Sequence, residues 1–341
     1  MPPKKAQKRR SRNVRGNGTV LPQELVNECL SYLTQPADLK AFALVCRSWS
    51  YAAQRALFRE VVLLSATYPT RLCNRLAETL RSASHLVQYI RTLRLHRREV
   101  ETGVFQKICN VSFTHLENVS VCDDRMTRRP AVALQRLFAL PTLRSVKLQC
   151  QFSDPVDFIQ LWNDCSPAIR HLDLRCWNSS YDSFQPNSSA HIALDSLKIE
   201  HVSHIQEWLE HDLCPFSFSL LAALSVVIDD SRGAVLDLSL FPTLVFLRIE
   251  INWRSCGNMA LNILSTITAS SRIRQIIFLC SVCRLVGLET SVRYYDSLAL
   301  RFPRLKSKNL LFRADSDWFE TQIRRIDAGV RYPDFAGGSR E

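Results

Sequence analysis

Glycine is scarce in this sequence, and so are the short motifs that depend on it. Only 9 of the 341 residues are glycine, and two of them, Gly16 and Gly18, fall within the first twenty positions. The sequence has no Gly-x-x-x-x-Gly-Lys loop, no Gly-x-Gly-x-x-Gly turn and no Gly-x-Ser-x-Gly elbow. Those motifs cradle phosphate groups or present a nucleophilic serine. We therefore expect neither a phosphate-cradling loop nor a nucleophile elbow.

Nothing in the sequence indicates secretion or membrane insertion. A bilayer-spanning helix needs about 18 or more apolar residues in succession. The longest apolar run, "LLAALSVVI" at 220–228, is much shorter and ends at Asp229 and Asp230. The first twenty residues lack the apolar core of a secretory signal. The twelve cysteines follow no framework spacing, so we expect free thiols in a reducing compartment, the cytoplasm, the nucleus or both.

Two residue pairs have metal-like spacing but lack partners. They are His201-x-x-His204, with His211 beyond, and Cys280-x-x-Cys283. A zinc site needs a second pair at a matching distance. We therefore expect no metal and no cofactor, with the histidines in a loop and Cys280 packed as a small apolar residue.

Acidic residues are missing from positions 1–20, which hold seven Lys and Arg residues. The net charge of the chain is +12, so this segment supplies more than half of it and leaves +5 for the rest. Residues 1–20 are predicted to be a disordered basic tail. The tail is either a nuclear-import signal or a solvated segment, with nucleic-acid contact as a further alternative. The folded part carries no strong basic excess, so nucleic acid is not an expected partner.

Three short helices are predicted within residues 21–61. Pro22 and Glu24 favour a first turn, and apolar residues follow at helical spacing. The tripeptide "TQP" at 34–36 separates the first helix from the second, and the third covers 46–58. Three helices of this length bury too little apolar surface to be stable alone. Their remaining apolar side chains therefore need a partner or a neighbouring domain.

The landmarks of this segment resemble the F-box. In order they are Leu21-Pro22, Glu24-Leu25, Leu33, Asp38-Leu39, Val45-Cys46-Arg47, Trp49 and Leu57-Phe58. Cys29 departs from the pattern, because a larger aliphatic residue is usual there. The resemblance implies a non-catalytic substrate receptor of a Skp–cullin–F-box (SCF) ubiquitin ligase, which acts in ubiquitin-dependent degradation. The residues that it implies as adaptor-facing or supporting are Leu21, Pro22, Leu25, Leu33, Leu39, Val45 and Trp49.

Two other interpretations of the helical segment are open. It can be a cap that covers the end of the following domain, although a cap does not require the Leu-Pro and Cys-Arg-x-Trp spacings. It can also be a helix-turn-helix DNA reader, whose recognition helix presents basic and amide side chains. The third predicted helix offers only Arg47, Gln54 and Arg55, which disfavours that reading.

A second pattern recurs every 23 to 29 residues between residues 90 and 278, with apolar residues at p, p+3 and p+5. The triplets are Ile90/Leu93/Leu95, Leu116/Val119/Val121, Leu143/Val146/Leu148, Ile169/Leu172/Leu174, Leu194/Leu197/Ile199, Leu221/Leu224/Val226, Leu244/Leu247/Ile249 and Ile273/Ile276/Phe278. A short strand followed by a helix, repeated at this period, predicts a stacked solenoid.

The array resembles leucine-rich repeats, as in the large fungal families of F-box receptors. That family has Asn or Cys three residues past the last strand position, and here only Asn252 fits. The predicted fold class is therefore α/β: a three-helix F-box (21–61), then an irregular leucine-rich-repeat-like solenoid of about eight repeats of ~26 residues (62–312). Residues 313–341 are expected to form a capping helix and a frayed tail.

The predicted target surface is the set of strand residues between the inward-pointing ones. Its members are Arg94, His96, Lys147, Gln149, Asp173, Arg175, Lys198, Glu200, Arg248, Glu250, Ile277 and Leu279. A merely solvated strand face is the alternative for the charged residues. Ile277 and Leu279 either mark a contact or lie under the C-terminal helix. The expected partners are a Skp-family adaptor, a cullin through it, and a protein target; the alternative function is an interaction scaffold outside any ligase.

Overall fold

The computed structural model describes residues 21–33, 35–63, 70–96, 102–176, 192–200, 209, 214–228, 236–251, 262–268 and 271–280. The chain divides into two compact units, Met1–Leu57 and Phe58–Glu341. The predicted basic tail and C-terminal capping helix lie outside the described residues, as do the metal-like residues His201, His204, His211 and Cys283.

Three helices open the described chain, as the sequence predicts. They are α1 (Gln23–Ser31), α2 (Pro36–Ala43) and α3 (Arg47–Phe58). Pro36 is the first residue of α2, a position where its missing N–H group is not needed. The helices pack around a core of Val26, Leu30, Leu39, Ala52 and Ala53. We call this assembly of α1–α3 the helical cluster; two of its five core residues are alanines, so it buries little apolar volume.

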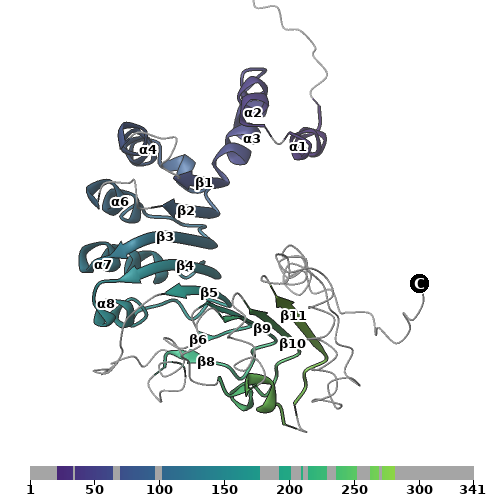
Figure 1. Ribbon diagram of the computed structural model, residues 1–341. Helices are drawn as coiled ribbons and strands as arrows, with labels where there is room; N and C mark the ends of the chain where they lie inside the picture. The colour runs from purple at the N-terminus through teal and green to yellow at the C-terminus, as the bar shows by residue number, and fades with distance from the viewer. Residues whose placement is uncertain are drawn as a thin grey trace, which may run out of the picture. The chain divides into compact units, whose positions relative to one another are not determined.

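A nine-stranded parallel sheet forms the second unit, with its strands in chain order (Figure 1). The strands are β1 (Glu60–Leu63), β2 (Thr92–His96), β3 (Asn118–Met126), β4 (Ser145–Phe152), β5 (His171–Cys176), β7 (Ser196–Glu200), β9 (Ala223–Ile228), β10 (Phe246–Ile251) and β11 (Gln275–Cys280). Two short strands, β6 (Ile192–Ala193) and β8 (Phe216–Ser217), pair separately. Eight of the nine long strands lie where the apolar triplets place them, and β1 was not predicted.

The strand register aligns Val61 of β1 with the middle residues of the eight triplets in one row. That row runs Val61, Leu93, Val119, Val146, Leu172, Leu197, Leu224, Leu247 and Ile276. All of these side chains are buried in the main core. Because side chains alternate along a strand, the residues between them point to the opposite face of the sheet.

Helices cover the face of the sheet that bears the apolar rows (Figure 1). They are α4 (Thr70–Ser82), α5 (Ser84–Val87), α6 (Thr102–Cys109), α7 (Arg128–Phe138) and α8 (Pro155–Gln160), and a 3-10 turn, η3 (Leu238–Leu240), follows later in the chain. Leu80, Phe105, Leu134 and Phe158 bring one apolar side chain each from α4, α6, α7 and α8 into the core. The sequence favours helices at 71–84, 131–140 and 155–165, where α4, α7 and α8 lie, and singles out none at α6. Two further stretches that it favours as helices, 205–213 and 258–270, lie partly outside the described residues.

Backbone hydrogen bonds, rather than an Asn ladder, join one strand–helix unit to the next. The Arg91 carbonyl accepts from the N–H groups of Glu117 (2.8 Å) and Asn118 (2.9 Å). The Glu117 carbonyl accepts in the same way from Arg144 (2.8 Å) and Ser145 (3.0 Å). The pattern continues through Arg170, Asp195, Ala222, Val245 and Arg274. These bonds use no side chain, so the units stay aligned although the sequence lacks the ladder residues.

The short helix α8 offers a test of local stability. Asp154 caps it, because the side-chain carboxylate accepts a hydrogen bond from the Val156 N–H at 2.8 Å. We expect Asp154→Ala to lower the free energy of unfolding by about 1 kcal/mol, since an uncapped N–H is left behind. Asp154→Asn also removes the charge but keeps a capping oxygen. Urea unfolding followed by tryptophan fluorescence should therefore show a loss for Ala only; equal losses for both variants would contradict the capping role.

Candidate functional site

The first helix of the cluster has apolar residues on two faces. Val26 and Leu30 are buried, with 2% and 8% of their surface exposed. Leu25 is 51% exposed, and Cys29, one turn further along the same side of α1, is also exposed. A helix that is apolar on two faces needs a neighbour for each. The described residues of the helical cluster cover only one of them.

Further apolar side chains are exposed around the α2–α3 connection. Leu44 is 87% exposed, Val45 60% and Tyr51 61%, and Tyr32 at the end of α1 is 75% exposed. Single exposed apolar residues are ordinary, but several in so short a segment mark an interaction surface. The sequence reasoning missed Leu44, Tyr32 and Tyr51. A sequence signal for Tyr51 was available, because at helical spacing it lies opposite the apolar stripe of Trp49, Ala53 and Ala56.

The predicted adaptor-binding residues fall into three groups in the structure. Leu21, Pro22, Leu25 and Val45 are exposed. Leu33 and Trp49 are half-buried and pack against the cluster core. Leu39 is buried, with 7% exposed, so it supports the helices from within.

Trp49 is held by an aromatic contact within the cluster. Its ring stacks on that of Phe42, with ring centroids 4.2 Å apart and planes at 16°. Stacked aromatic pairs contribute about 0.5–1.5 kcal/mol beyond their area burial. The stack therefore joins α2 to α3 and covers one face of the Trp49 ring, and the side chain stays half-buried.

Two other kinds of feature are absent from the described residues, a metal-ligand cluster and a membrane-spanning helix. Within them, no three His, Cys, Asp or Glu side chains are grouped as a metal site would require. In that same part of the chain, no helix has the length and apolar character to cross a membrane. What the helical cluster presents is an apolar surface suited to another protein.

Residues 19–64 match the F-box-like family. The chain thus contains an F-box-like domain, which spans α1, α2, α3 and β1 and includes every exposed apolar residue described above. Domains of this family bind Skp-type adaptors in general and serve SCF-type complexes. No curated protein matches this chain. The match supports the resemblance that the Leu-Pro and Cys-Arg-x-Trp landmarks indicated.

A cysteine within the F-box-like domain gives a test of the local geometry. Cys46 is exposed, and its sulfur lies 3.1 Å from the Ser48 hydroxyl. The Ser48 hydroxyl, followed by the Trp49 backbone, lowers the pKa of the Cys46 thiol because both can donate to the thiolate. A lower pKa means more thiolate near neutral pH. Cys46 should therefore be alkylated faster in the wild-type chain than in the Ser48→Ala variant.

The pH dependence of this alkylation can be followed by mass spectrometry of the modified peptide. Ser48→Ala should move the rate profile of Cys46 to higher pH. Burial raises the pKa of the Cys109 and Cys165 thiols, which should stay unmodified until the chain unfolds. An unchanged Cys46 profile in Ser48→Ala would contradict the hydrogen bond.

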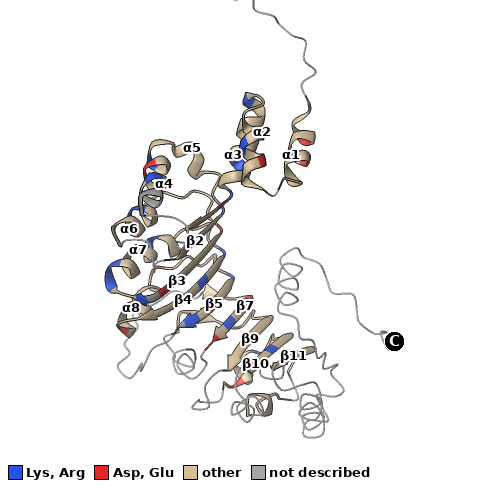
Figure 2. Cartoon of the chain, turned by 45° about the horizontal axis from the view of Figure 1, so that its top comes forward, with Lys and Arg blue, Asp and Glu red and all other residues tan. Residues whose placement is uncertain are grey.

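The second surface is the sheet face opposite the helices, which we call the strand face. Its middle row runs Val62, Arg94, Ser120, Lys147, Asp173, Lys198, Ser225, Arg248 and Ile277, and the next row runs His96, Cys122, Gln149, Arg175, Glu200, Val227, Glu250 and Leu279. Figure 2 marks positions of both charge signs on β5, β7 and β10, and β4 adds Lys147. The register thus brings together on one face all the residues predicted for the target surface.

Ion pairs neutralise most of the charge on the strand face. Lys147 lies 3.3 Å from Asp173, and Arg175 lies 3.0 Å from Glu200. Arg248 pairs with Glu250 at 2.9 Å. Burial lowers the pKa of Lys198, an effect that Asp173 and Glu200 oppose. Because each of these charges already has a partner within the sheet, the pairs serve the structure as much as any binding function.

The strand face is open at one end of the sheet and closed at the other. Arg94 is exposed, and His96, Lys147, Gln149, Asp173, Arg175, Lys198 and Glu200 are half-buried. Arg248 and Ile277 are buried, each 6% exposed, and they occupy adjacent register positions. Glu250 and Leu279 are half-buried. Ile277 and Leu279 therefore do not form the exposed apolar pair that alternation along a strand predicts, because alternation gives the face of a residue and not what lies above it.

Proposed function

We propose that this chain is a substrate-receptor subunit of a Skp–cullin–F-box ubiquitin ligase. The observation that carries the proposal is the exposed apolar surface of Leu21, Leu25, Leu44 and Val45 within an F-box-like domain. A Skp-family adaptor covers this surface and connects the chain to a cullin. An interface of the usual size buries about 1,600 Å² in total, with a few apolar anchors dominating the affinity.

The second unit is the proposed target-binding part. Its strands and helices form a leucine-rich-repeat-like solenoid of about eight repeats within residues 62–312. The aligned apolar rows and the backbone hydrogen bonds between units support this architecture. The open end of the strand face, from Arg94 to Glu200, holds the protein target.

The chain itself does no chemistry in this proposal. It holds the target beside a ubiquitin-conjugating enzyme, and tethering raises the effective concentration of target lysines at that enzyme. It acts in the cytoplasm or the nucleus. An interaction scaffold would use the same strand face without recruiting a cullin.

Affinity purification of the full chain, with the proteasome inhibited, tests the proposal. The expected result is recovery of a Skp-family adaptor and a cullin together, and of target proteins by mass spectrometry. Adaptor binding should also slow alkylation of Cys46, which follows Val45 directly. Recovery of target proteins without adaptor or cullin would favour the scaffold and overturn the ligase role.

A further inference from the structure

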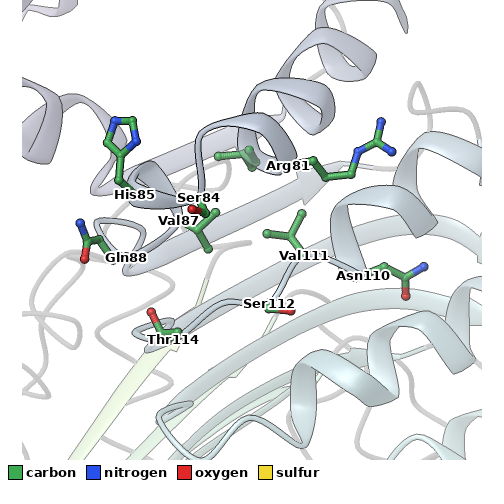
Figure 3. A pocket seen from close by; sticks show the side chains of 10 residues that line it. Arg81, Ser84, His85, Val87, Gln88, Asn110, Val111, Ser112 and Thr114 are labelled. Atoms are coloured by element: carbon green, nitrogen blue, oxygen red, sulfur yellow. The ribbon is translucent and has the colours of Figure 1, made fainter.

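A groove of about 540 Å³ lies on the second unit, between the α4–α5 corner and the loop after α6. Figure 3 shows Ser84, Val87 and Gln88 on one side and Val111, Ser112 and Thr114 on the other. Arg81, at the end of α4, and Asn110, at the end of α6, also line it. The groove is formed by the segments that precede β2 and β3, so it belongs neither to the helical cluster nor to the strand face.

The lining is rich in hydrogen-bond donors and has no acidic residue. Arg81 and His85 bring basic groups, and Ser84, Ser112 and Thr114 bring hydroxyls. The Asn110 side-chain oxygen accepts from Arg136 at 2.6 Å, which leaves the amide NH2 of Asn110 as a donor. Leu80, Val87 and Val111 provide an apolar floor, each of them buried.

Three of the lining side chains have no polar partner among the described residues. The side chains of Arg81, His85 and Ser112 make no hydrogen bond or ion pair with any residue that the structure describes. The strand face differs, because Lys147, Arg175 and Arg248 each have a carboxylate partner there. A negatively charged partner gains more from an unmatched cation than from a paired one, since no existing ion pair has to break.

We propose that this groove binds an acidic peptide segment of a partner protein. An Asp or Glu carboxylate of the peptide accepts hydrogen bonds from Arg81 and Asn110, and an adjacent aliphatic side chain packs on Leu80 and Val111. A nucleic acid fits less well, because strands are held by several phosphate contacts and by aromatic stacking. No aromatic residue lines the groove.

Fluorescence anisotropy with the full chain and labelled peptides tests the proposal. The probes are peptides of about eight residues that place Asp and Glu around a Leu, long enough to span roughly 27 Å when extended. The comparison peptides carry Asn and Gln in place of the acids. At about 50 mM salt, where screening is weak, the acidic peptides should bind and the amide versions should not.

Arg75 on the same helix provides a matched control. It is exposed, as Arg81 is, but it does not line the groove. Six residues of α-helix advance about 9 Å and turn the side chain by about 240°. Arg81→Glu should weaken the acidic peptides by at least about tenfold, and Arg75→Glu, which makes the same change in net charge, by less than about threefold.

Three results would overturn the proposal. They are no binding of acidic peptides to the wild-type chain, equal weakening by Arg75→Glu and Arg81→Glu, and tighter Arg81-dependent binding of a short single-stranded oligonucleotide. Skp-family adaptor binding, measured on the same samples, separates this inference from the proposed ligase role. Arg81 lies outside the F-box-like domain, so either can fail alone.

Discussion

Replacing Leu25 with aspartate should lower the affinity for a Skp-family adaptor by at least about 100-fold, or roughly 3 kcal/mol. Leu25 is 51% exposed, so the substitution leaves no cavity in the helical cluster. It is the third residue of α1, where an acidic side chain is favourable to the helix. The loss arises in the complex, where an unpaired carboxylate is buried in an apolar contact.

Asn27→Asp is the control for this variant. Asn27 is exposed on the same helix, and the substitution adds the same charge without removing an apolar side chain. Calorimetric titration with the adaptor should show a large loss for Leu25→Asp and a small change for Asn27→Asp. Circular dichroism should show both variants folded. A folded Leu25→Asp chain with wild-type affinity would exclude this face as the adaptor surface.

Trp49→Ala tests the stability of the same domain as well as its adaptor binding. The sequence predicts that either Leu25→Ala or Trp49→Ala weakens the adaptor complex by a few kcal/mol, partly through unfolding. The structure divides these effects between the two residues. Leu25 is exposed and should act almost wholly on binding, whereas Trp49 is half-buried and stacked on Phe42. Trp49→Ala should therefore also lower the stability of the helical cluster.

The positions of the strands could be predicted because every strand must bury apolar side chains in the core, and the apolar triplets repeat for that reason. Leu93, Val119 and Val146 each point into the core from a short strand, and the register then aligns them. The strand β1 was missed although Phe58, Val61 and Leu63 stand at p, p+3 and p+5, because Phe58 also belongs to the helix predicted at 46–58. The helix α6 was missed because its sequence, "TGVFQKIC", is short and has a glycine at its second position.

The site was harder to predict than the fold, because exposure depends on neighbours that are distant in sequence. Leu25 and Val26 are adjacent and equally apolar, yet one is half-exposed and the other buried. The helical period allows either one to face the core until the position of α3 is known. The groove beside Arg81 could not be predicted for the same reason, since its two sides come from segments more than twenty residues apart.

The core of the second unit should be most sensitive at Trp162. This side chain is fully buried, and its ring lies 5.3 Å from Phe138, 6.0 Å from Phe158 and 5.2 Å from Phe216. These partners come from α7, α8 and β8, so Trp162 joins three elements. Trp162→Ala should lower the free energy of unfolding by about 3–5 kcal/mol, because the cavity adds to the lost apolar burial.

Two further variants make the Trp162 prediction specific. Trp162→Phe keeps an aromatic ring among Phe138, Phe158 and Phe216, so it should be clearly less destabilising than Trp162→Ala. Val132→Ala on α7 removes an apolar side chain that is 47% exposed, and it should change stability by less than about 0.5 kcal/mol. Urea unfolding followed by circular dichroism gives all three values. A loss below about 1 kcal/mol for Trp162→Ala would mean that the aromatic cluster does not hold α7, α8 and β8 together.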